Sequence, residues 1–89
     1  MKAIMYNYSS WIEDTSPETL KDKFTNILKG SGFSVESFTE KYFEPFGYTA
    51  LFLLSESHFA IHTFPEEGRT YIELSSCVKA PFDEFVKRV

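Results

Sequence analysis

The residues of this chain that could do chemistry are concentrated in one stretch, residues 55–68, with the sequence SESHFAIHTFPEEG. Both histidines of the chain, His58 and His62, lie there, directly after Ser57, and the single cysteine, Cys77, follows on the next predicted strand. Imidazole, hydroxyl and thiol groups are the usual parts of acid–base and nucleophilic catalysis, and imidazole and thiolate also bind metals. We therefore ask whether these residues could form a metal centre and whether they could form a nucleophilic site.

A metal centre is not expected here. His58 and His62 are four residues apart, but the H-E-x-x-H pattern of zinc-binding helices is absent, and the aromatic and β-branched neighbours indicate a strand. At about 3.3 Å per strand residue, their Cα atoms would lie ~13 Å apart, too far for one shared ion. The sequence predicts no metal site.

A nucleophilic site also lacks its usual local signature. No G-x-S-x-G turn surrounds Ser57, and Cys77 has no papain-like neighbours. Taken singly, a lone cysteine is typical of a small buried hydrophobic residue, a strand histidine is more often structural, and Ser57 is typical of a turn. These residues alone do not define a reaction.

The elements that must position these residues begin with a strand and a helix. Residues 2–8 have apolar side chains on both faces and predict a first strand, which the polar residues 9–16 should end. Ser16 followed by Pro17 is a typical helix start, and Gly30 is the expected C-cap. Between them an apolar stripe recurs at helical spacing: Leu20, Phe24, Ile27 and Leu28.

Consecutive strands follow this helix. An alternating pattern predicts a strand at residues 33–43, with a slip near Ser37. Residues 48–55 are apolar on both faces and predict a central strand, and further strands are predicted at 58–64 and 69–77, before a short helix in residues 81–89. Runs of strands with a helix over one face indicate an α+β two-layer sandwich with a mainly antiparallel sheet, formed by residues 1–89 as one domain. Such a sheet leaves apolar area for a second subunit.

The composition limits the partners and the location. The net charge is −4 and no Lys/Arg cluster is present, so nucleic acid is not expected as a partner. The longest apolar run, residues 50–54, is too short for a membrane span, and the pattern of residues 1–15 leads us to expect no secretory signal. One cysteine excludes an internal disulfide and fits the cytoplasm.

A resemblance adds what composition cannot give. The motifs around Glu56-Ser57-His58, His62-Thr63-Phe64-Pro65-Glu66 and Cys77 are similar to those of the prokaryotic-type S-adenosylmethionine decarboxylases. The upstream segment Phe43-x-Pro45-x-Gly47-x-Thr49 resembles the same family. The correspondence covers about residues 43–77, and its three separate matches with consistent spacing are more specific than any one motif.

The family resemblance implies a self-cleaving proenzyme. The cut would fall between Glu56 and Ser57, giving chains of residues 1–56 and 57–89, with Ser57 converted into a pyruvoyl group, the cofactor. By resemblance, the hydroxyl of Thr49 supports the intermediate and His62 removes the α-proton. The pyruvoyl group would bind the α-amine of the substrate covalently and act as an electron sink during decarboxylation.

The resemblance also assigns the substrate contacts. Cys77 corresponds to the proton donor, Phe43 and Phe64 would sandwich the adenine of S-adenosylmethionine, and Glu66 would accept hydrogen bonds from its ribose. The implied product supplies spermidine synthesis. A homodimer is expected, because this family builds its sites at subunit junctions.

Several departures from the family pattern keep alternatives open. The early glycine-histidine motif is absent, the chain ends twelve residues after Cys77, Thr49 stands where serine is usual, and Phe64 stands where tryptophan is common. Ser57 and His62 are unaffected, and Thr49 keeps the hydroxyl group that self-processing needs. A pyruvoyl-dependent decarboxylase of arginine or ornithine is the second hypothesis, and an unprocessed, non-catalytic homologue acting as a binding or regulatory subunit is the third.

Overall fold

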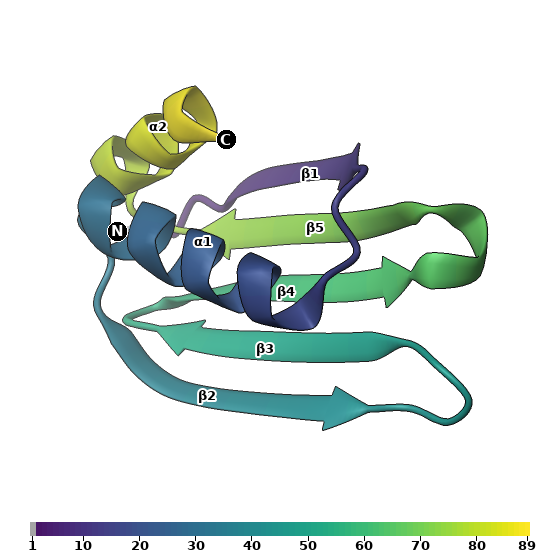
Figure 1. The fold of residues 1–89 in the computed structure, drawn as a ribbon. Coiled ribbons are helices and arrows are strands. Elements are labelled where there is room, and N and C mark those ends of the chain that lie inside the picture. The colour runs from purple at the N-terminus through teal and green to yellow at the C-terminus, as the bar shows by residue number, and fades with distance from the viewer. Residues whose placement is uncertain (1) are drawn as a thin grey trace.

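Five strands and two helices form two layers in residues 2–89, which are the residues that this structure, a computed structural model, describes. Figure 1 shows both helices in front of one face of the sheet. In chain order the elements are β1 (Tyr6–Ile12), α1 (Pro17–Ser31), β2 (Val35–Tyr42), β3 (Tyr48–Leu54), β4 (Ser57–Phe64), the 3-10 turn η1 (Pro65–Glu67), β5 (Arg69–Ser76) and α2 (Lys79–Arg88). The sheet order is β1-β5-β4-β3-β2, and every pairing is antiparallel. The predicted α+β sandwich is confirmed.

The first strand lies later in the sequence than the apolar pattern predicts. Residues 2–5 are outside the strand, and β1 continues through Ser9 and Ser10 to Ile12. The prediction was wrong because β1 is an edge strand whose outer face is exposed, so polar residues are tolerated there. Its pairing with β5 places Trp11 opposite Tyr71.

Helix α1 begins where the sequence predicts but ends two residues later than expected. Ser16 is the N-cap residue without a side-chain cap bond; its N–H instead binds the Asp14 carboxylate at 2.9 Å. The helix passes through Gly30 and stops at Gly32, which has φ 108°. That left-handed conformation favours glycine, and the N–H of Gly32 binds the carbonyl of Lys29.

The core lies between the helices and the inner face of the sheet. Phe24 of α1, Phe59 of β4 and Phe85 of α2 are fully buried, and their ring centroids are 5.0 to 6.3 Å apart. The predicted slip near Ser37 is present as a bulge between Val35 and Ser37 in β2. This packing holds the β3–β4 hairpin against the helix layer.

The outer face of the sheet has no covering layer within the described chain. Leu51 and Leu53 point to this side of β3 and are 46% and 55% exposed, and Trp11 of β1 is 48% exposed. Beside Leu51 and Leu53, a shallow hollow of about 320 Å³ extends to His58. Among residues 2–89, neither helix has the length and apolar character needed to cross a membrane.

Candidate active site

The predicted cleavage position lies in the hairpin turn that joins β3 to β4. Leu54 pairs with Ser57, so only Ser55 and Glu56 connect the two strands. Glu56 has φ 59°, the one positive φ of a non-glycine residue in the described chain. An L-residue in this conformation costs about 1–2 kcal/mol. Strain is therefore present directly before the Glu56–Ser57 peptide bond.

The carbonyl of Glu56 and the hydroxyl of Ser57, the two groups that would react, are held by Cys77 and Ser76 at the end of β5. The Cys77 thiol donates to the carbonyl oxygen of Glu56 at 3.4 Å. The Ser57 hydroxyl, which points into the inner layer and is 5% exposed, donates to the hydroxyl of Ser76 at 2.8 Å. The register of β4 with β5 pairs Ser57 with Ser76 and so produces both contacts.

Thr49 and His62, predicted to act in processing, contact each other. They are direct partners in the β3–β4 register, and Thr49 Oγ1 lies 3.0 Å from His62 Nδ1. The imidazole of His62 also lies over the ring of Tyr71, with centroids 6.4 Å apart. All three side chains are partly exposed on the outer face.

The structure separates these two groups of predicted residues. Ser57 and His62 are five residues apart on β4, which is about 16 Å at 3.3 Å per residue. Because five is odd, their side chains also point to opposite faces of the sheet. Within one chain, His62 therefore does not reach Ser57 or Cys77.

The predicted substrate residues lie at the end of the sheet where His62 is found. Phe43 directly follows β2, Phe64 ends β4, and Glu66 lies in η1, so all three belong to the loop end opposite the β3–β4 turn. Phe43 and Phe64 are 47% and 37% exposed. The backbones of β2 and β4 are two strand spacings apart, about 10 Å, a distance that leaves space for a planar ring between two aromatic side chains.

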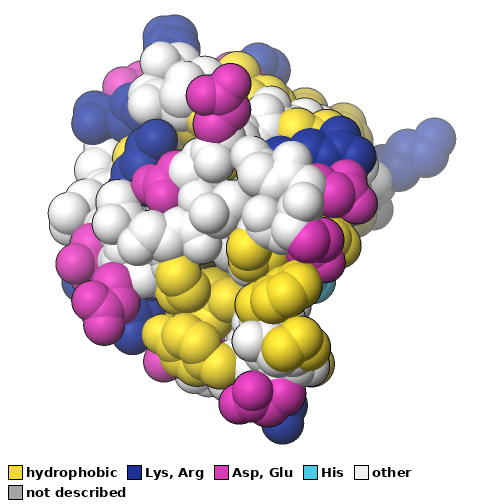
Figure 2. Space-filling view, turned by 45° about the vertical axis from the view of Figure 1, so that its right-hand side comes forward, with side chains coloured by type: hydrophobic (Ala, Val, Ile, Leu, Met, Phe, Trp, Pro, Cys, Tyr) yellow, Lys and Arg dark blue, Asp and Glu magenta, His cyan; other side chains and the backbone are white. Residues whose placement is uncertain are grey.

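Hydrophobic side chains gather at this loop end. Figure 2 shows them together on the lower part of the molecule. Here Tyr42, Phe43 and Phe46 are exposed, and they border a hollow of about 340 Å³ that also includes Pro17 and Pro65. An exposed aromatic group of this kind is typical of a binding surface.

Sequence reasoning missed a cluster that surrounds Phe64. The Trp11 indole packs against Phe64, with ring centroids 5.7 Å apart, and the Arg69 guanidinium lies 3.9 Å from the centroid of the Trp11 ring. Arg69 also pairs with Glu67 of η1 through two nitrogens, at 2.9 and 3.1 Å. The cluster joins Phe64 to the turn that carries Glu66. The cluster was missed because the predicted first strand ended before Trp11, whereas β1 continues to Ile12.

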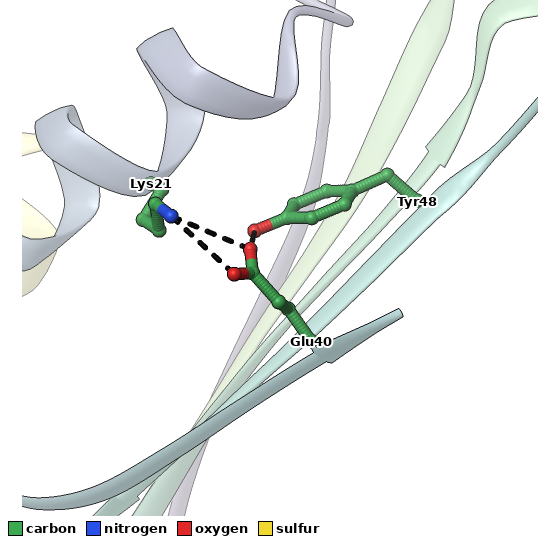
Figure 3. Close-up of polar contacts among 3 residues, drawn as sticks. All are labelled: Lys21, Glu40 and Tyr48. Carbon is green, nitrogen blue, oxygen red and sulfur yellow. Dashed lines mark hydrogen bonds and ion pairs between the residues drawn. The ribbon is translucent and has the colours of Figure 1, made fainter. Parts of the chain in front are cut away.

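A second polar network fixes the start of β3, next to Thr49. Figure 3 shows Lys21 of α1, Glu40 of β2 and Tyr48 of β3 meeting on the inner side of the sheet. The Tyr48 hydroxyl donates to Glu40 at 2.6 Å, and Lys21 Nζ is 3.4 Å from the same carboxylate. The hydrogen bond from Tyr48 and the charge of Lys21 lower the pKa of Glu40. Burial and the Glu40 carboxylate raise the pKa of Tyr48 well above its ordinary value.

Comparison with known proteins decides the family. The family model for S-adenosylmethionine decarboxylase matches residues 5–89. This chain belongs to the S-adenosylmethionine decarboxylase family. A S-adenosylmethionine decarboxylase proenzyme of Brevibacillus brevis is 42% identical over 60 residues, which are 67% of this chain and 45% of that protein. A proenzyme of the same name from Prochlorococcus marinus is 38% identical over 58 residues, 65% of this chain and 46% of that protein.

The fold agrees with a solved member of this family. The adenosylmethionine decarboxylase of Aquifex aeolicus superposes with a TM-score of 0.75 at 19% identity, covering 99% of this chain and 82% of that one. This likeness shows the fold alone. The matched segments span less than half the length of the two curated relatives from Brevibacillus brevis and Prochlorococcus marinus.

Proposed function

We propose that this member of the S-adenosylmethionine decarboxylase family is a proenzyme that cleaves itself between Glu56 and Ser57 and then decarboxylates S-adenosylmethionine. The observation that carries the proposal is the arrangement at the β3–β4 turn. A strained residue precedes the peptide bond, a thiol binds its carbonyl and a neighbouring hydroxyl holds the nucleophile. A positive φ is common in two-residue hairpins, but the turn itself does not require a thiol on its carbonyl or a hydroxyl that holds the following serine.

The proposed cleavage proceeds through an ester. Ser57 Oγ attacks the carbonyl carbon of Glu56; the C–O bond forms, the C–N bond breaks, and the hydroxyl proton is transferred to the nitrogen of Ser57. A base then removes the α-proton of Ser57, and Glu56 leaves as a carboxylate that keeps this oxygen. The resulting enamine tautomerises to an imine, and water hydrolyses it to a ketone with release of ammonia.

The residues around position 57 fit a pyruvoyl group made in place. Ser57 supplies its carbon atoms, and the position is enclosed by the inner layer of the sheet. The pyruvoyl group supplies an electron sink for loss of CO₂. Cys77, which the structure places against Glu56, would then lie beside the new N-terminus as a proton donor to the substrate carbon.

The loop end of the sheet supplies the proposed substrate contacts. Phe43 and Phe64 would hold the adenine by stacking, and the sulfonium charge would be attracted to aromatic faces, each effect worth about 0.5–2 kcal/mol. Glu66 is exposed in η1, free of the salt bridge that engages its neighbour Glu67. Its carboxylate could accept hydrogen bonds from the two ribose hydroxyls. The product would serve the synthesis of spermidine in the cytoplasm.

The separation of the two groups supports a homodimer. A two-fold axis that stacks the exposed outer faces with reversed strands would bring His62 and Thr49 of one copy toward Ser57 and Cys77 of the other. Leu51, Leu53 and Trp11 would be covered in this arrangement. Each active site would then use residues of both copies.

Intact mass spectrometry under denaturing conditions tests the cleavage, and CO₂ release from carboxyl-labelled S-adenosylmethionine tests the reaction. We expect two chains that meet after Glu56, the C-terminal one without a free amine, and labelled CO₂. A Ser57→Ala variant, which lacks the nucleophile, should stay whole and inactive. An unsubstituted chain that remains uncut on incubation would refute the proposal. If the chain is cleaved but releases CO₂ only from arginine or ornithine, S-adenosylmethionine is not its substrate.

A further inference from the structure

Ser76 holds the hydroxyl of Ser57 but has no role of its own in the steps of the proposed reaction. It ends β5, directly before Cys77, and its side chain is completely buried. Its hydroxyl oxygen accepts a hydrogen bond from Ser57 at 2.8 Å and another from the backbone N–H of Val78 at 3.0 Å. Its own proton is directed to the Val78 carbonyl oxygen, at 3.4 Å.

These contacts favour one direction for the bond between the two serines, with Ser57 as the donor. A hydroxyl has one proton and two lone pairs. Val78 occupies the donor and one acceptor position of Ser76, so the position left for Ser57 is an acceptor. Ser57 therefore donates, and its own two lone pairs are not used by Ser76.

We infer that Ser76 is a positioning residue for self-cleavage, an inference that rests on the proposed function. It fixes the rotamer of Ser57 so that the lone pairs of Oγ, rather than its proton, can face the carbonyl carbon of Glu56. Cys77 holds the oxygen of that carbonyl. Two consecutive residues thus hold the nucleophile and the electrophile of one bond-forming step.

The step on which Ser76 acts is the acyl shift alone. In that step the Glu56 C–N bond is exchanged for a C–O bond to Ser57, and the hydroxyl proton moves to the nitrogen. Ser76 keeps its own proton throughout. Without this hydrogen bond the Ser57 side chain would sample other rotamers, and the fraction poised for attack would fall.

The variants Ser76→Ala and Ser76→Cys test this role. Alanine removes the acceptor, and cysteine keeps the approximate size but replaces oxygen with a weak acceptor. We expect the first-order rate of cleavage, followed by intact mass, to fall about 10- to 100-fold in Ser76→Ala, the effect of losing one buried hydrogen bond in the reacting geometry. Ser76→Cys should be slowed and Ser76→Thr, which keeps the hydroxyl, should cleave faster than both.

Hydroxylamine separates a positioning role from a general loss of structure. It cleaves esters much faster than amides, so it reports whether the acyl shift has occurred. A His62→Ala chain, blocked after the ester, should be cut by hydroxylamine, whereas Ser76→Ala should gain little. Ser75→Ala is the matched control, since Ser75 faces the outer side and binds Asn7; it should cleave at the unsubstituted rate.

Thermal unfolding of Ser57→Ala with and without Ser76→Ala measures the structural cost in chains that cannot cleave. Cleavage of Ser76→Ala and Ser76→Cys within threefold of the unsubstituted rate would overturn the inference while leaving the proposed function intact. Equal acceleration of Ser76→Ala and His62→Ala by hydroxylamine would also overturn it. An unsubstituted chain that never cleaves would instead contradict the proposed function.

Discussion

The distance between Ser57 and His62 allows a test of whether the processing base comes from a second copy. Five strand residues separate them by about 16 Å, and a general base must come within about 3 Å of the proton donor. A rotamer change cannot close a gap of that size from the opposite face of a sheet. We therefore expect His62 to act on the partner's Ser57.

Co-expression of two inactive variants gives the measurement. Ser57→Ala alone cannot be cut, and His62→Ala alone should cleave about 10²–10⁴-fold more slowly. In a mixed pair, the intact His62 of the Ser57→Ala chain faces the intact Ser57 of the His62→Ala chain. Random pairing places about half of the His62→Ala chains in mixed pairs, so about half should be cut.

Differently tagged chains and intact mass spectrometry show which chain is cut. Co-expression of His62→Ala with the doubly substituted Ser57→Ala/His62→Ala chain is the control, because that partner offers no imidazole at position 62. Cleavage no greater than in this control, although sequential affinity purification through the two tags recovers mixed pairs, would refute the reasoning.

Two further predictions concern the surroundings of the site. Trp11→Ala should raise the KM for S-adenosylmethionine about five- to tenfold, because the indole fixes Phe64. Trp11→Phe should retain most of the affinity, and a fall in kcat at constant KM would contradict this role. Tyr48→Phe should flatten the loss of stability at alkaline pH. The raised pKa of Tyr48 means that the folded state favours the neutral phenol. The contribution of Tyr48 to the free energy of unfolding is therefore complete below pH 10, and it is lost as the pH rises from there toward the raised pKa. Denaturant unfolding between pH 8 and 11 measures it, and equal slopes in the two proteins would show that Tyr48 does not titrate with unfolding.

Local patterns predicted most of the fold. The apolar stripe of α1, the apolar run of β3 and the bulge near Ser37 all depend on neighbours in the sequence, and the structure has these three elements. The predicted end of α1 and the predicted end of β1 were wrong, because neither is determined by neighbouring residues alone. Gly30 and Gly32 are equivalent as candidate caps, and only the docking of α1 decides which one ends the helix. Polar residues 9 and 10 belong to an edge strand that the sequence cannot distinguish from a loop.

Site prediction was limited by strand register. The period of a strand already places Ser57 and His62 on opposite faces, so their separation could have been inferred from the sequence. The contact between Ser57 and Ser76 could not, since a shift of one residue between β4 and β5 would reverse the side on which Ser76 lies. The Trp11 cluster likewise depends on the register of β1 with β5.

The two steps of the proposed cleavage use groups on opposite faces of the sheet. Ser57 directs its hydroxyl to the inner side, where Ser76 holds it for the acyl shift. The α-hydrogen of a tetrahedral Cα lies away from Cβ, so the base that removes it approaches from the outer side or the strand edge. His62 of the same chain is on the outer side but at the wrong end. A copy stacked with reversed strands would place its own His62 there, so dimer formation would be required for ester elimination but not for ester formation.

A monomeric variant, such as Leu51→Glu with Leu53→Glu, should therefore accumulate a chain that hydroxylamine cuts after Glu56. If that chain instead matures fully as a monomer, the base lies within one copy and the shared site is wrong.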